Sequence, residues 1–405
     1  MVQEPSPVMF DHLYSLSDRR EYDELIRHIR DHENEEVRYG AAGVLSESVD
    51  GFREEITPQT RKALVESVLN EPSDAVRANI VRTLLHIDES IIDNIITRLE
   101  VAPESTPTEM PYPRILTNWH GTEWPELRYL AVAGFGRSNS QSAAEKLRAT
   151  IQEEMDMRVL RRAIEEGGKV GDETFVEPIQ TYLRADNEKL YQSANADQLT
   201  QTKQAAVEAL VKIGTDAAYE ALVTASRGTD EELRGCVISE IGKFGAENTV
   251  DLIVDELNND ADDALRAEAA EGLITTFTES EFDEGHAVRQ QAIEQIGDDV
   301  ATDVSDEFAS IVTESPRKPE QRNAAWLLGQ IEGDAEDTID GLLAGLEDDD
   351  EYLRIIAAAG LTTFDPAVVA DKLAEFRDSV DDTSEAHVLA SSILSTMQDT
   401  SDEIS

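Results

Sequence analysis

Three copies of one pattern decide the fold of this chain: KQAAVEALVKIG (203–214), RGCVISEIGKFG (234–245) and RAEAAEGLITTF (266–277). Their first residues, Lys203, Arg234 and Arg266, follow one another at intervals of about 32 residues. A fixed period of this length is typical of a solenoid, in which each repeat is a helix pair that stacks on its neighbours.

Each copy has the pattern of an amphipathic helix. In the second copy Leu233, Val237 and Ile241 recur at helical spacing and form one apolar stripe, whereas Glu232 and Glu240 lie away from it. A second amphipathic segment follows each of the first two copies: DAAYEALVTAS (216–226) and ENTVDLIVDELNN (247–259). Each repeat is therefore predicted to be a helix, a turn and a second helix.

A basic residue stands near the start of the first helix in eight such repeats. Alanine and glycine follow it in most copies, so we expect neighbouring helices to approach one another closely. We predict a structural role for the basic residue, because a guanidinium there can bond acidic groups or free carbonyls of the adjacent repeat. A role in binding a partner is the alternative. The eight residues are Arg38, Arg77, Arg128, Lys203, Arg234, Arg266, Arg322 and Arg354.

These elements predict an all-α protein, an α-solenoid (superhelix) of stacked helix pairs. Stacked repeats bury one continuous core, so a chain of 405 residues need not divide into separate globular domains. We expect N-terminal capping helices at 1–34, one solenoid at 35–365, C-terminal capping helices at 366–398 and a disordered tail at 399–405.

Two steps between successive basic residues are longer than the period. The step from Arg77 to Arg128 is about 51 residues, because residues 101–125 are inserted. The step from Arg266 to Arg322 is about 56 residues, and two predicted helices fill it, at 286–299 and 302–314.

The insertion at 101–125 contains five prolines and two of the three tryptophans, so it cannot be one continuous helix. Long loops inside compact domains are often functional, and Trp and Tyr dominate interface energetics. We expect the aromatic side chains of this loop to fold back and cover the helices; the alternative is a loop that binds a partner. On the alternative, replacing Trp119 and Trp124 by alanine weakens partner binding without unfolding the chain. The candidate partner-binding residues are Tyr112, Trp119, His120 and Trp124.

The chain is strongly acidic, with 85 acidic and 35 basic residues, a formal net charge of −50 and a pI near 4.3. Nucleic acid is an unfavourable partner, because affinity for phosphate depends on clustered Lys and Arg. The acids are spread along the whole chain, a composition that resembles haloarchaeal cytoplasmic proteins; an acidic surface made for a basic partner is the competing interpretation. No run of 18 apolar residues occurs, so we expect no membrane insertion and a cytoplasmic location.

The repeated motif resembles HEAT repeats of the short phycobilisome-lyase type. The resemblance covers roughly residues 35–370 and implies a non-catalytic scaffold or adaptor that binds other proteins. Some haloarchaeal proteins similar to this chain act as adaptors around taxis and motility signalling, which makes such components the specific partner hypothesis. The segments that carry the resemblance are EVRYGAAGVL (36–45), QAAVEALVKIG (204–214), LRGCVISEIGKFG (233–245) and QRNAAWLLGQIEGD (321–334).

Two groups of enzymes have repeats that resemble those of this chain. Deoxyhypusine hydroxylase, to which the repeats are similar, holds a di-iron centre on His-Glu pairs, and the only such pair here is His32-Glu33. The seven histidines (12, 28, 32, 86, 120, 286 and 387) are scattered in sequence, and bilin lyases presuppose a phycobiliprotein substrate. We therefore predict no catalytic residue, no metal and no cofactor. The alternatives are an enzyme or enzyme accessory subunit of the lyase or hydroxylase type, and a structural assembly factor.

Overall fold

The computed structural model is all helical in the part of the chain that it describes. That part comprises residues 4–53, 55–99, 112–138, 140–184, 187, 194–245, 247–258, 263–281, 284–296, 304–331 and 335–404. The all-α prediction is confirmed, since these residues form helices and no strand. Contacts group them into two compact units, Met1–Ile213 and Gly214–Ser405, where the sequence predicts one solenoid over 35–365.

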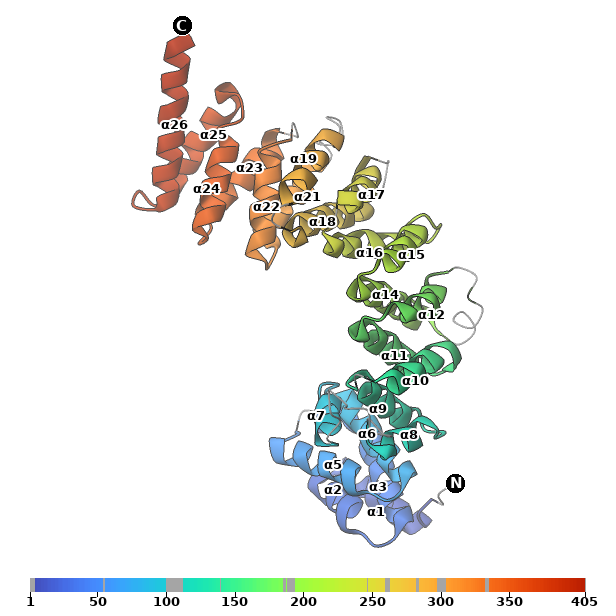
Figure 1. Ribbon diagram of the computed structural model, residues 1–405. Coiled ribbons are helices and arrows are strands. Elements are labelled where there is room, and N and C mark those ends of the chain that lie inside the picture. The colour runs from blue at the N-terminus through green and yellow to red at the C-terminus, as the bar shows by residue number, and fades with distance from the viewer. Residues whose placement is uncertain are drawn as a thin grey trace. The chain divides into compact units, whose positions relative to one another are not determined.

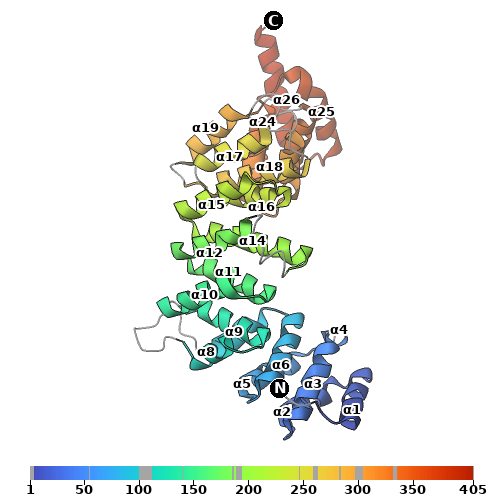
Figure 2. The ribbon, with the colours of Figure 1, turned by 90° about the vertical axis from the view of Figure 1, so that its right-hand side faces the viewer.

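Unit 1 is built from two rows of helices (Figures 1 and 2). Its Arg-bearing row consists of α3, α6, α9, α11 and α14, and each of these helices packs against the next. Behind this row, α2 packs on α5, α5 on α7, and α10 on α12. The helices are α1 (Pro7–Asp18), α2 (Tyr22–Asp31), α3 (Glu35–Glu47), α4 (Val49–Arg53), α5 (Pro58–Asn70), α6 (Asp74–Ile87), α7 (Ile91–Arg98), α8 (Arg114–His120), α9 (Pro125–Gly136), α10 (Gln141–Glu153), α11 (Met157–Val170), η1 (Glu173–Phe175), α12 (Val176–Gln180), η2 (Thr181–Leu183) and α14 (Ala196–Ile213).

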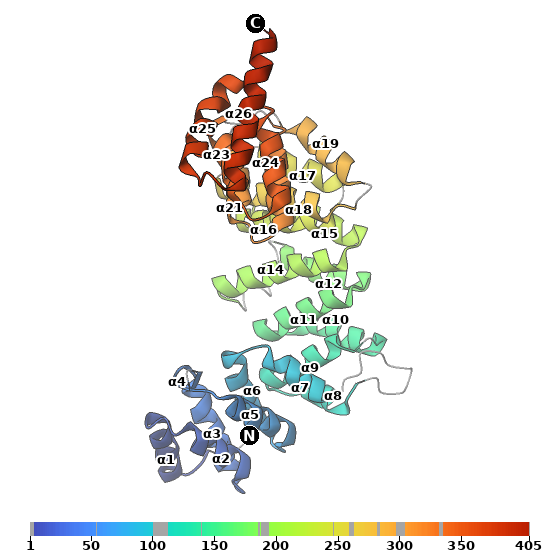
Figure 3. The same ribbon diagram turned by 90° about the vertical axis from the view of Figure 1, so that its left-hand side faces the viewer.

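Unit 2 has the same organisation (Figures 1 and 3). Its Arg-bearing row consists of α16, α18, α22 and α24, again packed in that order, and the second row pairs α17 with α19, α21 with α23, and α23 with α25. Helix α21 also packs against α18 and α22 of the first row. The helices are α15 (Asp216–Ser226), α16 (Glu231–Ile241), η3 (Gly242–Phe244), α17 (Glu247–Asn258), α18 (Asp263–Glu279), α19 (Gly285–Gln295), α21 (Ser305–Glu314), α22 (Lys318–Leu328), α23 (Ala335–Glu347), α24 (Glu351–Leu361), α25 (Pro366–Ser379) and α26 (Glu385–Ile404).

Local sequence signals place the helix starts. The Thr57 side chain accepts a hydrogen bond from the backbone N–H of Thr60, and Pro58 is the first helical residue of α5. Asn34, Asp230 and Asp350 cap α3, α16 and α24 in the same way. Short polar residues therefore end the turns before the Arg-bearing helices in both units.

Helices form at both ends of the described chain. Helices α1 and α2 occupy the segment 1–34, and α25 together with the first part of α26 occupies the segment 366–398. The prediction of a disordered tail at 399–405 is wrong up to Ile404, because α26 continues to that residue. Residues 385–404 contain neither Gly nor Pro, so nothing local stops the helix.

Alanine and glycine bring the Arg-bearing helices close together. Ala205, Ala209 and Ala270 are almost fully buried, at 5%, 1% and 0% exposure. Directly after α16, a Cβ on Gly242 would come within 2.2 Å of the Gly272 carbonyl oxygen in the middle of α18. The close approach predicted for the helix centres thus extends to the C-terminal end of α16.

Replacing Gly272 by alanine is expected to destabilise unit 2. The new Cβ would lie 2.4 Å from the Ile238 carbonyl oxygen, so α16 and α18 must separate, at a cost of about 1–3 kcal/mol. Urea unfolding followed by circular dichroism measures the loss. The control is Gly121→Ala, where an added Cβ meets nothing closer than 3.7 Å. Equal stability of Gly272→Ala and wild type would contradict the close backbone contact.

Candidate functional site

The described part of the insertion, residues 112–125, packs against unit 1. Residues 114–120 form α8, and Trp119 is only 1% exposed. The Arg77 guanidinium lies 5.3 Å from the centroid of the Trp119 ring. The Phe135 ring of α9 contacts both Tyr112 and His120, with ring centroids 4.9 and 5.5 Å apart.

The four candidate residues of the insertion are buried to different degrees, and partner binding by Tyr112, His120 and Trp124 stays a prediction. Trp119 is buried in the core, Tyr112 and His120 pack on α9, and Trp124 is half-buried at the N-cap of that helix. The short helix inside the insertion turns the large side chain of Trp119 inward, where its burial stabilises unit 1. Residues 101–111 lie outside the described residues.

Four of the predicted structural arginines share one backbone contact. Three of them donate to the carbonyl oxygen of the residue six positions earlier, in the turn before the helix, at an ordinary hydrogen-bond distance: Arg38 to His32 at 3.0 Å, Arg128 to Thr122 at 3.1 Å and Arg354 to Asp348 at 2.8 Å. Arg77 makes the same contact with the Glu71 carbonyl. The guanidinium thus closes the turn that positions its helix.

The predicted structural arginines also pair with carboxylates, all of them outside the arginine's own helix except for Asp74, the partner of Arg77. Arg38 forms a bidentate pair with Glu71, with both N–O distances at 3.0 Å, and Arg128 forms one with Glu154, at 2.7 and 2.9 Å. Weaker or more exposed pairs join the others: Arg77 with Asp74, Arg234 with Glu256 at 3.5 Å, Arg266 with Glu307 at 3.7 Å, Arg322 with Asp350 and Arg354 with Glu385. Lys203 on α14 is 9% exposed. These cations are engaged within the chain.

Helix α22 departs from this arrangement by one residue. Gln321, not Arg322, donates to the carbonyl oxygen six positions earlier, that of Ser315, at 3.0 Å. Arg322 instead pairs with Asp350, and its guanidinium lies 4.9 Å from the Tyr352 ring centroid of α24. This change by one residue in the position of the donor side chain occurs directly after the irregular step between Arg266 and Arg322.

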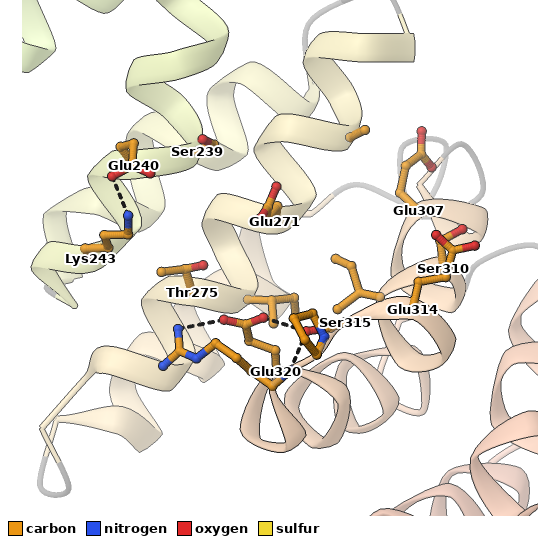
Figure 4. A pocket seen from close by; sticks show the side chains of 15 residues that line it. Ser239, Glu240, Lys243, Glu271, Thr275, Glu307, Ser310, Glu314, Ser315 and Glu320 are labelled. Carbon is orange, nitrogen blue, oxygen red and sulfur yellow. Dashed lines mark hydrogen bonds and ion pairs between the residues drawn. The ribbon is translucent and has the colours of Figure 1, made fainter. Parts of the chain in front are cut away.

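That irregular step produces a groove in unit 2 of about 570 Å³ (Figure 4). We name it the acidic groove. It lies across the C-terminal end of α16, the middle of α18, helix α21 and the turn into α22. Apolar atoms come from Ala267, Ile274, Ile311 and Pro316, and carboxylates from Glu240, Glu271, Glu307, Glu314 and Glu320.

The five carboxylates of the acidic groove differ in their partners. Glu240 pairs with Lys243, and Glu320 pairs with Arg317 at 2.7 Å and accepts from the Ser315 hydroxyl (Figure 4). Glu271 forms no ion pair within the described ranges, and burial raises its pKa, an effect to which the charges of Glu268, Glu320 and Glu240 add. The groove thus contains negative charge that the chain does not compensate.

Glu307 is the most perturbed carboxyl group in the groove. Burial, followed by the hydrogen bond and charge of Asp306, raises its pKa to about 7. Arg266 opposes this shift from 3.7 Å, and one carboxylate oxygen of Glu307 is buried without a hydrogen bond. Its cost of ionisation is therefore only partly offset by the chain.

Glu307→Gln is expected to change the pH dependence of stability. Folding raises the pKa of Glu307 to about 7. Its contribution to the unfolding free energy is therefore fully present below its ordinary pKa of 4.5 and is lost as pH rises through 7. The neutral glutamine removes this loss. The variant should exceed wild type in unfolding free energy by about 1 kcal/mol near pH 8, after allowance for solvent screening. Urea unfolding at about pH 5 and pH 8 tests this, and parallel pH profiles for the two proteins would contradict it.

The structure also gathers histidines that are far apart in sequence. His12 of α1 and His28 of α2 have ring centroids 5.9 Å apart, and His28 and His32 are 5.8 Å apart. Burial, and then the charges of His32 and His12, lower the pKa of His28. These three histidines of α1, α2 and the turn after α2 therefore lie together in space, which the sequence did not predict. No group of three or more His, Cys, Asp or Glu side chains within the described ranges is arranged to hold a metal ion.

The sequence did not predict the acidic groove. Its one feature that relates to the groove is the step of about 56 residues between Arg266 and Arg322, which indicated two extra helices but not where they pack. Only the contacts of α21 with both α18 and α22 form the hollow. In the part of the chain that the structure describes, no helix has the length and apolarity needed to cross a membrane.

Comparisons with known proteins support the repeat assignment. A family model described as HEAT repeats matches residues 187–274, which contain the three regular copies almost entirely. No curated protein matches the sequence. Three solved structures illustrate the likeness of fold. The first is the karyopherin Kap121p bound to the extreme C-terminus of the protein phosphatase Cdc14p, with a TM-score of 0.38 and 11% identity over 95% of this chain and 43% of that chain. The second is the CpcE–CpcF complex of phycocyanin lyase from Nostoc sp. PCC7120, with a TM-score of 0.30 and 16% identity over 68% of this chain and 94% of that chain. The third is a structure from work on the interaction of cadherin and beta-catenin, with a TM-score of 0.43 and 11% identity over 96% of this chain and 95% of that chain. The chain spans less than half the length of this karyopherin, and these likenesses carry no argument about activity or partners.

Proposed function

From the HEAT repeats of residues 187–274 we propose that this chain is a non-catalytic scaffold or adaptor that binds other proteins along the face of its Arg-bearing helices. Solenoids of stacked helix pairs offer extended surfaces suited to that task. The observation that carries the proposal is the acidic groove, because three of the four α-helices that line it, α16, α18 and α22, belong to the Arg-bearing row of unit 2 and only α21 belongs to the second row.

Exposed apolar side chains on the same row support the proposal. Tyr352 and Ile355 on α24 are 64% and 53% exposed, and they lie three residues apart, on one side of the helix. Tyrosine is enriched in the energetic centres of protein interfaces. Arg322 already stacks on Tyr352, which leaves a polar and an aromatic group side by side for a partner.

An affinity pull-down from a halophilic host at molar salt tests the proposal. The full chain is the bait, and cross-linking with mass spectrometry maps each recovered protein. We expect cross-links at α16, α18, α22 and α24, and few at α17, α23 and α25 of the second row. Cross-links distributed evenly over both rows would contradict binding at the Arg-bearing face.

Metal and chromophore analysis of the same purified protein separates the rival functions. An enzyme or enzyme accessory subunit of the lyase or hydroxylase type should carry near-stoichiometric iron, zinc or pigment without a protein partner. A structural assembly factor should be recovered in a stable stoichiometric complex, whereas an adaptor should exchange its partners.

Three finer statements belong to the same proposal. The acidic composition supports a haloarchaeal origin, the resemblance of the repeats supports taxis or motility components as partners, and the absence of long apolar runs supports a cytoplasmic location. Recovery of such components in the pull-down supports the second statement. A set of partners without any of them would contradict it.

A further inference from the structure

The acidic groove combines two kinds of surface. Ala267 and Ile274 of α18 and Ile311 of α21 contribute apolar atoms, and Pro316 adds to them from the turn into α22. Carboxylates of Glu240, Glu271, Glu307, Glu314 and Glu320 surround these atoms (Figure 4). A groove of this kind is not suited to an aliphatic side chain alone, which would leave the carboxylates desolvated beside it.

Charge identifies the occupant more closely. Lys243 and Arg317 each neutralise one carboxylate of the groove, while Glu271 and Glu314 make no ion pair within the part of the chain that the structure describes. An anionic ligand would add repulsion to this excess of negative charge. A cation removes the repulsion, and charge-assisted hydrogen bonds to carboxylates are among the stronger ones.

Building on the proposed function, we propose that the acidic groove receives a lysine or arginine side chain from a basic segment of a partner protein. Long basic side chains lay their methylene stems along apolar surface and keep the charged head among polar groups. Here the stem lies over Ile274 and Ile311, and the head lies among Glu271, Glu307 and Glu314. The volume of about 570 Å³ also leaves room for residues next to the basic one.

Binding of a synthetic peptide tests this inference. The probe is a short fluorescent peptide of alternating lysine and alanine, and fluorescence anisotropy follows its binding to the full chain. The matched peptide carries acetyl-lysine, which keeps the stem and removes the charge. Wild type should bind the lysine peptide more tightly than the acetylated one, and Glu271→Gln should weaken the lysine peptide about tenfold, the effect of losing one charge-assisted bond.

The control variant is Glu347→Gln, which also removes an exposed charge, from the end of α23 and outside the groove. General attraction to the acidic surface falls with salt, in the same proportion in both variants. The inference therefore requires that the weaker binding of Glu271→Gln relative to Glu347→Gln persists as KCl is raised. Equal affinities of the two variants, or equal binding of the two peptides by wild type, would overturn it.

The pull-down distinguishes this inference from the proposed function. If partners are recovered equally by wild type and Glu271→Gln, the scaffold function stands and the basic-segment inference fails. If wild type recovers no protein, the scaffold function itself fails. Circular dichroism of Glu271→Gln should match wild type, since glutamine keeps the shape of the glutamate side chain.

Discussion

Replacing Trp119 by alanine is expected to lower the unfolding free energy of the chain by about 3–5 kcal/mol. Trp119 is 1% exposed, so its removal leaves a large cavity between α8 and the helices that it packs against. The variant also loses the contact with the Arg77 guanidinium, which lies 5.3 Å from the ring centroid. Urea unfolding at high salt, followed by circular dichroism, measures the change.

The control for this experiment is Trp124→Ala. Trp124 is only half-buried, at the N-cap of α9, so its replacement should cost clearly less than that of Trp119. The comparison decides between the two interpretations of the insertion. If Trp119→Ala kept wild-type stability and lost partner binding, the insertion would be a binding loop, in conflict with the burial of Trp119.

Replacing Arg128 by alanine should be nearly as damaging. The side chains of Arg128 and Glu154 are 19% and 8% exposed, and two charge-assisted hydrogen bonds join them. Removing one partner of a buried pair leaves the other charge uncompensated and typically costs about 3–5 kcal/mol. Arg128 also holds the Thr122 carbonyl, so the turn between α8 and α9 loses a contact.

The Arg128 variant has a pH signature as well. Burial alone would raise the pKa of Glu154, but hydrogen bonds from Arg128 and from the backbone N–H groups of Met155 and Asp156 lower it. In wild type, the ionised Glu154 therefore adds to the unfolding free energy above its ordinary pKa of 4.5. This contribution is lost as pH falls through the lower pKa that Glu154 has in the folded chain. Without Arg128 the pKa of Glu154 rises, so acid unfolding should begin at higher pH.

An exposed ion pair provides the matched control for Arg128. Arg27 pairs with Glu24 on α2, with side chains 61% and 42% exposed, and such pairs contribute about 0–1 kcal/mol. Arg27→Ala should therefore leave the urea midpoint and the acid limb nearly unchanged. Equal losses of unfolding free energy in the two variants would indicate a general effect of net charge, and not the loss of the hydrogen-bonded pair of Arg128 and Glu154.

The sequence by itself determined the repeated helices. The period of about 32 residues, the apolar stripes and the short polar caps are all local, and a helix depends on contacts within four residues. The positions of α5, α16, α24 and α25 were therefore predictable from their caps and stripes. The repeated basic residue was predictable too, because its place near the helix start puts the guanidinium beside the preceding turn.

Only the tertiary structure decided what the two irregular steps do. The first step turns Trp119 inward, which helical periodicity cannot reveal, because it does not say which neighbour covers a seven-residue helix. The second step brings α21 against α18 and α22, and so forms the acidic groove from residues as far apart as Ser239 and Glu320. Both outcomes depend on packing between distant segments, and the shape and charge of such contacts have no local signature in the sequence.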